Sequence, residues 1–218
     1  APLTATANLS VVLANGCVVA VANPLTYTAP VLTQLNAAAP PLQVAAIAPP
    51  AVVTITGTNF GTLPVGTIVT VRLTAQSSIF ADGTSNTMDL GGLVAAANTV
   101  TFRPPSVTLC GAATVNADLG VLFPGGSCDG ILNAITYNAP QVSATPATAF
   151  PVQNLAYAGQ PFAIVGLGGV NAFGPVGATV NVRFSVAAGT PFQGGTSAFA
   201  VVPGTITSAT TIVGVAPA

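Results

Sequence analysis

The residue types that usually perform acid–base or nucleophilic chemistry are scarce in this chain of 218 residues, which contains three Arg, four Asp and no Lys, Glu or His. Without His or Lys, no base is present to activate a Ser, Thr or Cys nucleophile. Paired carboxylates remain, either Asp82 with Asp89 or Asp118 with Asp129. Both pairs lie in Gly-rich stretches, where Asp commonly hydrogen-bonds to its own backbone. We therefore expect no enzyme activity and no catalytic residue.

Residues suited to metal binding or redox chemistry are equally scarce. Residues 82–89, DGTSNTMD, offer oxygen ligands but lack the alternating Asp/Asn pattern of a calcium loop, so we expect a turn there and no cofactor. Cys110 and Cys128 would close a loop of about 18 residues, worth about 3 kcal/mol in an oxidising compartment. We predict this disulfide, which leaves Cys17 either buried as a small apolar residue or joined to another subunit.

The composition limits the partners of the chain. Hydrophobic residues make up 51% and charged residues 3%, yet Pro, Gly, Asn or Thr interrupts every apolar run well before the roughly 20 residues of a spanning helix, so we expect no membrane insertion. A net charge of -1 provides no basic patch for nucleic acid. A dispersed protein usually has a surface that is about a quarter to a third charged. This surface must therefore be covered by uncharged polar groups or buried against other copies of the chain.

A repeat organises the chain. Residues 52–73, VVTITGTNFGTLPVGTIVTVRL, return as residues 162–184, FAIVGLGGVNAFGPVGATVNVRF. Each copy reads as a strand, a Gly/Asn/Phe corner, a Pro-Val-Gly turn and a second strand that ends near Arg72 or Arg183. The offset of about 110 residues is the length of one sandwich domain. The sequence therefore predicts two related β domains in tandem.

An N-terminal arm precedes the first copy. Asn15-Gly16 lies between two apolar runs and predicts a hairpin with a type I′ turn. A similar segment, residues 107–130, places Cys128 about 111 residues after Cys17, so we expect an arm before each sandwich. The predicted boundaries are 1–26 for the N-terminal hairpin, 27–109 for the first sandwich, 110–136 for an interdomain arm and 137–218 for the second sandwich. The residues expected to form the assembly arm are Leu9, Val11, Leu13, Val19 and Val21.

The corner formed by Gly57, Asn59, Phe60 and Gly61 resembles that of the IPT/TIG immunoglobulin-like family, in which a strand is followed by Gly-x-Asn-Phe-Gly and a further strand. The resemblance covers most of residues 27–107 and, more weakly, residue 137 to the C-terminus. In the second copy the corner is longer, and Asn171 and Phe173 are no longer adjacent. The resemblance implies an all-β fold of two tandem immunoglobulin-like sandwiches.

These features favour a structural subunit of an extracellular filament or surface appendage, with other copies of itself as partners. An exposed strand edge can be completed by a strand from a neighbour, and a head-to-tail contact that does not close produces a fibre. The alternative is a cell-surface adhesin or a module that binds carbohydrate or protein, using Tyr27, Tyr137, Tyr157 or some of the ten Phe as aromatic platforms. A viral tail or capsid component is a third reading. The start at Ala1-Pro2 fits cleavage by a signal peptidase, and Asn8-Leu9-Ser10 is a formal glycosylation sequon, so a surface anchor or a glycan are further partners that the sequence allows.

Overall fold

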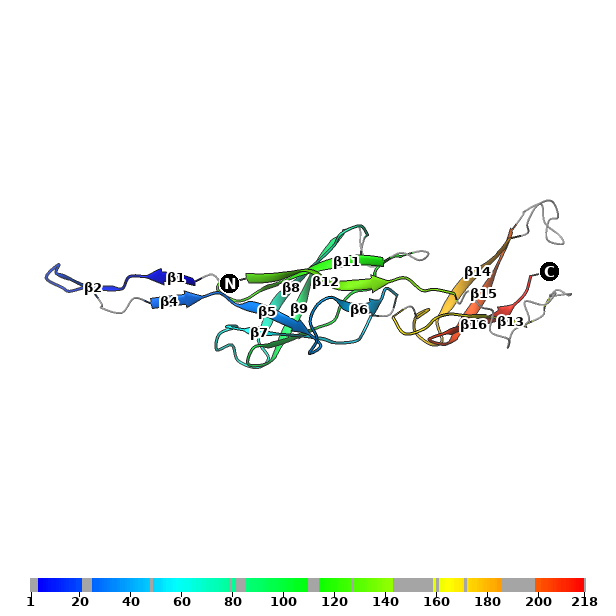
Figure 1. Ribbon diagram of the computed structural model, residues 1–218, viewed down its shortest axis with the longest axis horizontal. Coiled ribbons are helices and arrows are strands. Elements are labelled where there is room, and N and C mark those ends of the chain that lie inside the picture. Colours follow the sequence, from blue (N-terminus) through cyan, green and yellow to red (C-terminus); the bar gives the residue numbers. More distant parts are fainter. Residues whose placement is uncertain are drawn as a thin grey trace.

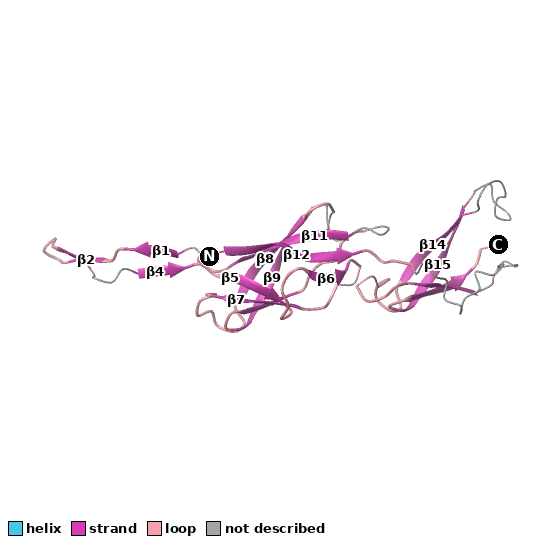
Figure 2. Ribbon diagram, in the orientation of Figure 1, coloured by secondary structure: helices cyan, strands magenta, loops and turns pink. Residues whose placement is uncertain are grey.

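The computed structural model describes residues 4–20, 25–47, 49–78, 80, 85–109, 114–126, 128–142, 159, 161–170, 172–185 and 199–217. All regular elements in these ranges are β-strands, which confirms the all-β prediction. Within them no helix is long and apolar enough to cross a membrane. Figures 1 and 2 show an elongated molecule with a hairpin at one end, a large sheet in the middle and a smaller sheet at the other end.

The N-terminal hairpin has two paired sections. β1 (Thr4–Ala7) pairs with β4 (Leu25–Thr28), and β2 (Ser10–Val12) pairs with β3 (Val18–Ala20), both antiparallel. The predicted turn is present, because the N–H of Gly16 donates to the carbonyl of Leu13 at 2.8 Å. It is not of type I′, since Gly16 has a positive φ of 83° and Asn15 does not. A type I turn followed by a left-handed Gly gives this geometry.

The large sheet contains eight strands in the order β5-β7-β10-β9-β8-β11-β12-β6. Only β6 and β12 run parallel, and the other neighbours are antiparallel. The strands are β5 (Val31–Leu35), β6 (Leu42–Ala45), β7 (Val53–Thr58), β8 (Ile68–Ala75), β9 (Thr87–Ala96), β10 (Thr99–Phe102), β11 (Thr114–Leu122) and β12 (Cys128–Asn138).

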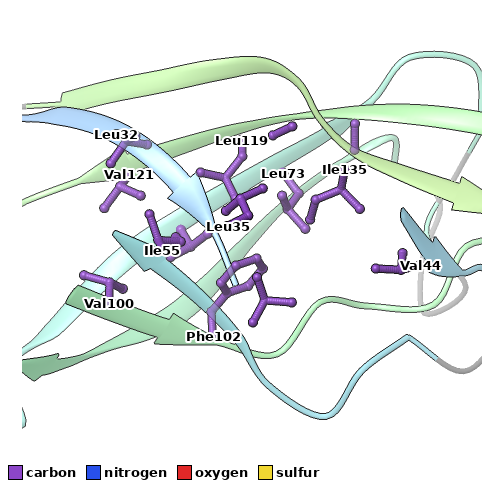
Figure 3. Packing of buried hydrophobic residues seen from close by; sticks show 14 of the residues in the cluster. Leu32, Leu35, Val44, Ile55, Leu73, Val100, Phe102, Leu119, Val121 and Ile135 are labelled. Carbon is purple, nitrogen blue, oxygen red and sulfur yellow. The ribbon is translucent and has the colours of Figure 1, made fainter. Parts of the chain in front are cut away.

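This sheet folds over so that its two ends meet. The backbone N–H of Leu32 in β5 donates to a carboxylate oxygen of Asp129 in β12 at 2.7 Å. Alternate residues of β7, β8 and β11 are buried, as expected for strands with one face toward a core. The core is therefore enclosed between two halves of one sheet, and its side chains converge from both halves in Figure 3.

The smaller sheet contains β13 (Pro161–Val165), β14 (Thr179–Ser185), β15 (Phe199–Ser208) and β16 (Thr211–Val215), in the order β13-β16-β15-β14. All of its neighbours are antiparallel. Among the described residues its cluster of buried side chains is small and consists of Phe173, Ile206 and Ile212.

The two sheets share one pattern, as the repeat predicts. The order β7-β10-β9-β8 in the large sheet corresponds to β13-β16-β15-β14 in the smaller one. The turns correspond as well, because the N–H of Thr67 donates to Pro64 at 3.1 Å and the N–H of Ala178 donates to Pro175 at 3.2 Å. What the large sheet has in addition is β5, β6 and the hairpin of β11 and β12.

The predicted interdomain arm, 110–136, requires a correction. β11 pairs with β8 along six successive residues, from Ala117 opposite Ala75 to Leu122 opposite Thr70. Leu119 and Val121 of β11 are buried in the core of the large sheet. Buried and less buried residues alternate along β11, as expected for a strand that pairs with the free edge of β8 and turns one face to the core. This segment therefore completes the large sheet that precedes it. The first unit therefore extends to the end of β12, and Tyr137 belongs to its core.

Candidate assembly interface

The carboxylates considered for catalysis have structural partners. Asp118 accepts a hydrogen bond from the backbone N–H of Asn133 at 2.7 Å, and Asp129 holds the N–H of Leu32 as described above. Asp89 pairs with Arg72 in two hydrogen bonds of 2.7 Å each. Asp82 lies outside the described residues. The described carboxylates therefore connect different strands of the large sheet.

The pair of Arg72 and Asp89 joins β8 to β9 on the exposed face of the sheet. Both side chains are about half exposed, at 50% and 47%. The hydrogen bond from Arg72 lowers the pKa of the Asp89 carboxyl, and the hydrogen bond to Asp89 raises the pKa of Arg72. An exposed pair of this kind contributes little to stability.

The predicted disulfide involves one residue that the structure does not describe. Cys17 and Cys128 are both exposed with free thiols, and Cys110 lies outside the described residues. Because Cys128 is a free thiol, the structure does not show the predicted bridge between Cys110 and Cys128. Mass mapping of the unreduced protein would check it. Cys17 is exposed, so the expectation that it is buried as a small apolar residue is wrong. In the described ranges no group of three or more potential metal ligands comes together.

The corner predicted from Gly57 to Gly61 closes one end of the first core. Asn59 and Gly61 both have positive φ, 60° and 79°, and Phe60 is buried with 7% of its surface exposed. A Cβ on Gly57 would lie 2.5 Å from the ring of Phe60, so only Gly allows the ring to pack there. Phe60 also packs against Phe123, with ring centroids 4.9 Å apart and ring planes tilted by 43°.

The second corner reproduces this packing despite its longer sequence. A Cβ on Gly166 would lie 2.5 Å from the ring of Phe173, which is 6% exposed. Phe173 therefore takes the place of Phe60, while Asn171 lies outside the described residues. The backbone also corresponds, because the N–H of Gly166 donates to Thr210 at 2.8 Å and that of Gly57 donates to Asn98 at 3.1 Å.

The N-terminal hairpin exposes every one of its strand residues. Val21 lies outside the described residues. An isolated two-stranded hairpin is only marginally stable in water, and this long one carries apolar side chains on its surface. The residues of the predicted arm that the structure describes are all exposed, namely Leu9 at 44%, Val11 at 50%, Leu13 at 47% and Val19 at 52%.

Residues 1–30 align with residues 111–140 at a constant offset of 110, with Thr4, Leu9, Val11 and Tyr27 identical to their counterparts. The strand pairing follows the same alignment. Thr4 lies opposite Thr28 and Ala7 opposite Leu25, just as Thr114 lies opposite Asn138 and Ala117 opposite Ile135. The N-terminal hairpin is therefore a second copy of the hairpin formed by β11 and β12.

The two hairpins differ in burial. Leu9 is 44% exposed and its counterpart Leu119 is 1% exposed. Val11 is 50% exposed and its counterpart Val121 is fully buried. Leu13 corresponds to Phe123, which is 5% exposed and packs on the corner. The same face of the hairpin is thus free in one copy and part of a core in the other.

Sequence reasoning recognised the resemblance between the two arms but assigned each arm to the sandwich that follows it. The signal that could have corrected this lies in the alternation of Leu119, Val121 and Phe123, which predicts a strand with one buried face. It cannot say which sheet edge buries that face, because the segments before and after it both offer strands of similar pattern.

The three tyrosines considered as aromatic platforms for carbohydrate differ in their surroundings. Tyr137 is fully buried, and burial raises the pKa of its phenol. Tyr157 lies outside the described residues. Tyr27 is 59% exposed and lies in β4 of the N-terminal hairpin.

Comparisons with protein-family models, with curated proteins and with solved structures find no match to this chain.

Proposed function

We propose that the protein is a structural subunit that joins copies of itself head to tail into an extracellular filament or surface appendage, using the N-terminal hairpin as the connector. The observation that carries this proposal is the exposure of Leu9 and Val11 in a hairpin whose second copy buries Leu119 and Val121. The chain already contains one example of how such a hairpin is used: it completes a sandwich.

The fold that fits the proposal is an immunoglobulin-like sandwich of the IPT/TIG kind. In such sandwiches the strands A, B, E and D form one sheet and C, F and G form the other. The large sheet has this order when β5, β7, β8, β9, β10, β11 and β12 are taken as strands A to G. The smaller sheet then corresponds to strands B, E, D and C, and the hairpin of β11 and β12 corresponds to strands F and G.

The arrangement of the molecule supports a fibre. The hairpin and the smaller sheet lie at opposite ends of the long axis (Figure 1). A contact between two different surfaces at opposite ends propagates as an open chain of subunits. Burial of apolar strands between copies also suits a chain in which only 3% of residues are charged.

The test compares two neighbouring residues of β2. Val11 corresponds to the fully buried Val121, whereas Val12 corresponds to Leu122, which keeps 39% of its surface exposed. In the unassembled chain both are exposed, at 50% and 67%. Val11→Asp should therefore abolish fibres, and Val12→Asp should retain them, as seen by negative-stain microscopy at neutral pH.

Deletion of residues 1–28 provides an independent check and should leave dispersed particles. Fibres formed by the deletion variant or by Val11→Asp would contradict the connector role. Dispersed wild-type protein would contradict the filament itself and favour a binding module.

A further inference from the structure

β8 and β14 occupy the same position in the four-strand order that the two sheets share, but they pair with different numbers of strands. β8 pairs with β9 on one edge and with β11 on the other. β14 pairs with β15, and among the described residues no second strand pairs with it. The outer edge of β14 therefore presents the backbone groups that β8 uses to hold β11.

The side chains on β14 are also less buried than those on β8. Val71 and Leu73 are fully buried in the large sheet. Their counterparts Val182 and Phe184 are only partly buried. Val182 packs against the small cluster around Ile206, and Phe184 packs against Phe162 with ring centroids 5.1 Å apart. The alignment of the two strands rests on the corresponding turns at Pro64 and Pro175 and on Arg72 and Arg183. The smaller sheet thus has the beginning of a core without the hairpin that would complete it.

Building on the proposed function, we propose that the outer edge of β14 is the acceptor and that its occupant is the N-terminal hairpin of a second copy, held in the register that β11 has on β8. Because the hairpin lies at the opposite end of the molecule from β14, its own chain is not placed to supply it (Figure 1). The occupant is identified by the offset of 110 residues and the shared strand register of the two hairpins.

The register follows residue by residue from the large sheet. Leu119 lies opposite Leu73, Val121 opposite Val71 and Leu122 opposite Thr70. The corresponding pairs between copies are Leu9 with Phe184, Val11 with Val182 and Val12 with Asn181. Leu13, the counterpart of Phe123, then reaches Phe173 at the second corner. The first two pairs point into the core, and the pair of Val12 and Asn181 lies on the outer face.

The test uses engineered cysteines in the full chain after Cys17, Cys110 and Cys128 are replaced by Ser. Val12→Cys is combined with Asn181→Cys in one variant and with Thr179→Cys in the other. Asn181 and Thr179 are both exposed and lie two residues apart on the same face of β14. Paired strands lie about 4.8 Å apart and two residues along a strand span about 6.6 Å, so the Cα atoms of the out-of-register pair would be about 8.2 Å apart. A disulfide requires Cα atoms within about 7 Å of each other, so only the in-register pair should bond.

Fibres should form from both variants, and only the variant with Asn181→Cys should give a ladder of covalent multimers on non-reducing electrophoresis that collapses on reduction. Fibres without that ladder, or with a stronger ladder from Thr179→Cys, would overturn the acceptor edge and its register while leaving the filament intact. A bond formed within one chain would overturn the role of the second copy. Absence of fibres from the Cys-free parent at neutral pH would instead remove the proposed function itself.

Discussion

The hairpin of β1 to β4 and the hairpin of β11 and β12 have the same strand register and opposite surroundings. Tyr27 and Tyr137 occupy equivalent positions, yet Tyr27 is 59% exposed and Tyr137 is fully buried. The difference shows that local pairing alone does not make a hairpin part of a core. A sheet with an open edge must lie beside it, and among the described residues only the second hairpin pairs with such an edge, at β8.

The two sheets differ in how completely their cores are formed. The large sheet contains its hairpin and has a continuous core, whereas the described part of the smaller sheet has three buried side chains in its cluster. Free energy gained by burying apolar surface is about 25 cal/mol per Å², so the two units should differ in stability. The comparison can be tested at four levels.

The largest expected effect separates the two hairpins directly. Leu119→Ala leaves a cavity in a packed core and should lower the free energy of unfolding of the unassembled chain by about 2–5 kcal/mol. Leu9→Ala changes an exposed residue and should alter it by less than about 0.5 kcal/mol. Urea titration of dissociated protein measures both, and equal losses would show that the hairpins are not in different environments.

The corners should respond alike if the two sheets are copies of one fold. Gly57→Ala places a Cβ against the carbonyl of Val31 and the ring of Phe60, and Gly166→Ala places one 2.8 Å from the carbonyl of Gln141 and 2.5 Å from the ring of Phe173. Each should destabilise its own unit by about 1–3 kcal/mol. Gly91→Ala, where nothing lies within 4 Å, is the control and should be neutral. Tolerance of Gly166→Ala alone would indicate that the second corner is not closed.

The buried tyrosine offers a smaller effect with a pH signature. Burial raises the pKa of Tyr137 above its ordinary value, and its hydroxyl has no hydrogen-bond partner among the described residues. Because the unfolded chain ionises near pH 10 and the folded chain does not, stability is full below that pH and should fall as the pH rises above about 10.

Tyr137→Phe removes the unpaired hydroxyl and should raise the free energy of unfolding at neutral pH by up to about 1 kcal/mol, while flattening the alkaline loss. Urea titrations at neutral and alkaline pH measure both changes. Tyr27→Phe in the exposed hairpin is the matched control and should leave the neutral value unchanged. A clear loss of stability in Tyr137→Phe would mean that its hydroxyl is hydrogen-bonded.

The smallest effect concerns the exposed pair of Arg72 and Asp89. The pKa of Asp89 is lowered by Arg72, so the contribution of the pair is present at neutral pH and is lost as the pH falls through the folded pKa, below the ordinary value of about 4. In the smaller sheet Arg183 lies opposite Val201 and has no such partner there. Asp89→Asn should lower the urea midpoint slightly at pH 7 and not at about pH 2. An equal loss at both values would point to lost packing and exclude the charge as the cause.

Much of the local structure could be predicted from the residues. Asn15-Gly16 marks a hairpin turn, and Gly57 with Phe60 marks a corner, because each depends on backbone freedom or ring packing within a short segment. The turn type was wrong, since it depends on how the flanking strands twist and on the register of β2 and β3. The boundary at residue 110 was wrong because β11 finds its partner β8 more than 40 residues earlier in the chain.

The sequence by itself determined that this is an all-β chain with two related units, two related hairpins and almost no residues suited to catalysis. These properties follow from residue types, short-range turn chemistry and the offset of 110 residues. Only the tertiary structure decided that the second hairpin completes the unit before it, that the first hairpin is exposed and that β14 has an open edge among the described residues. The physical reason is that an alternating strand specifies which face it buries but not which sheet edge receives it, and that choice depends on which edge the rest of the chain leaves unpaired.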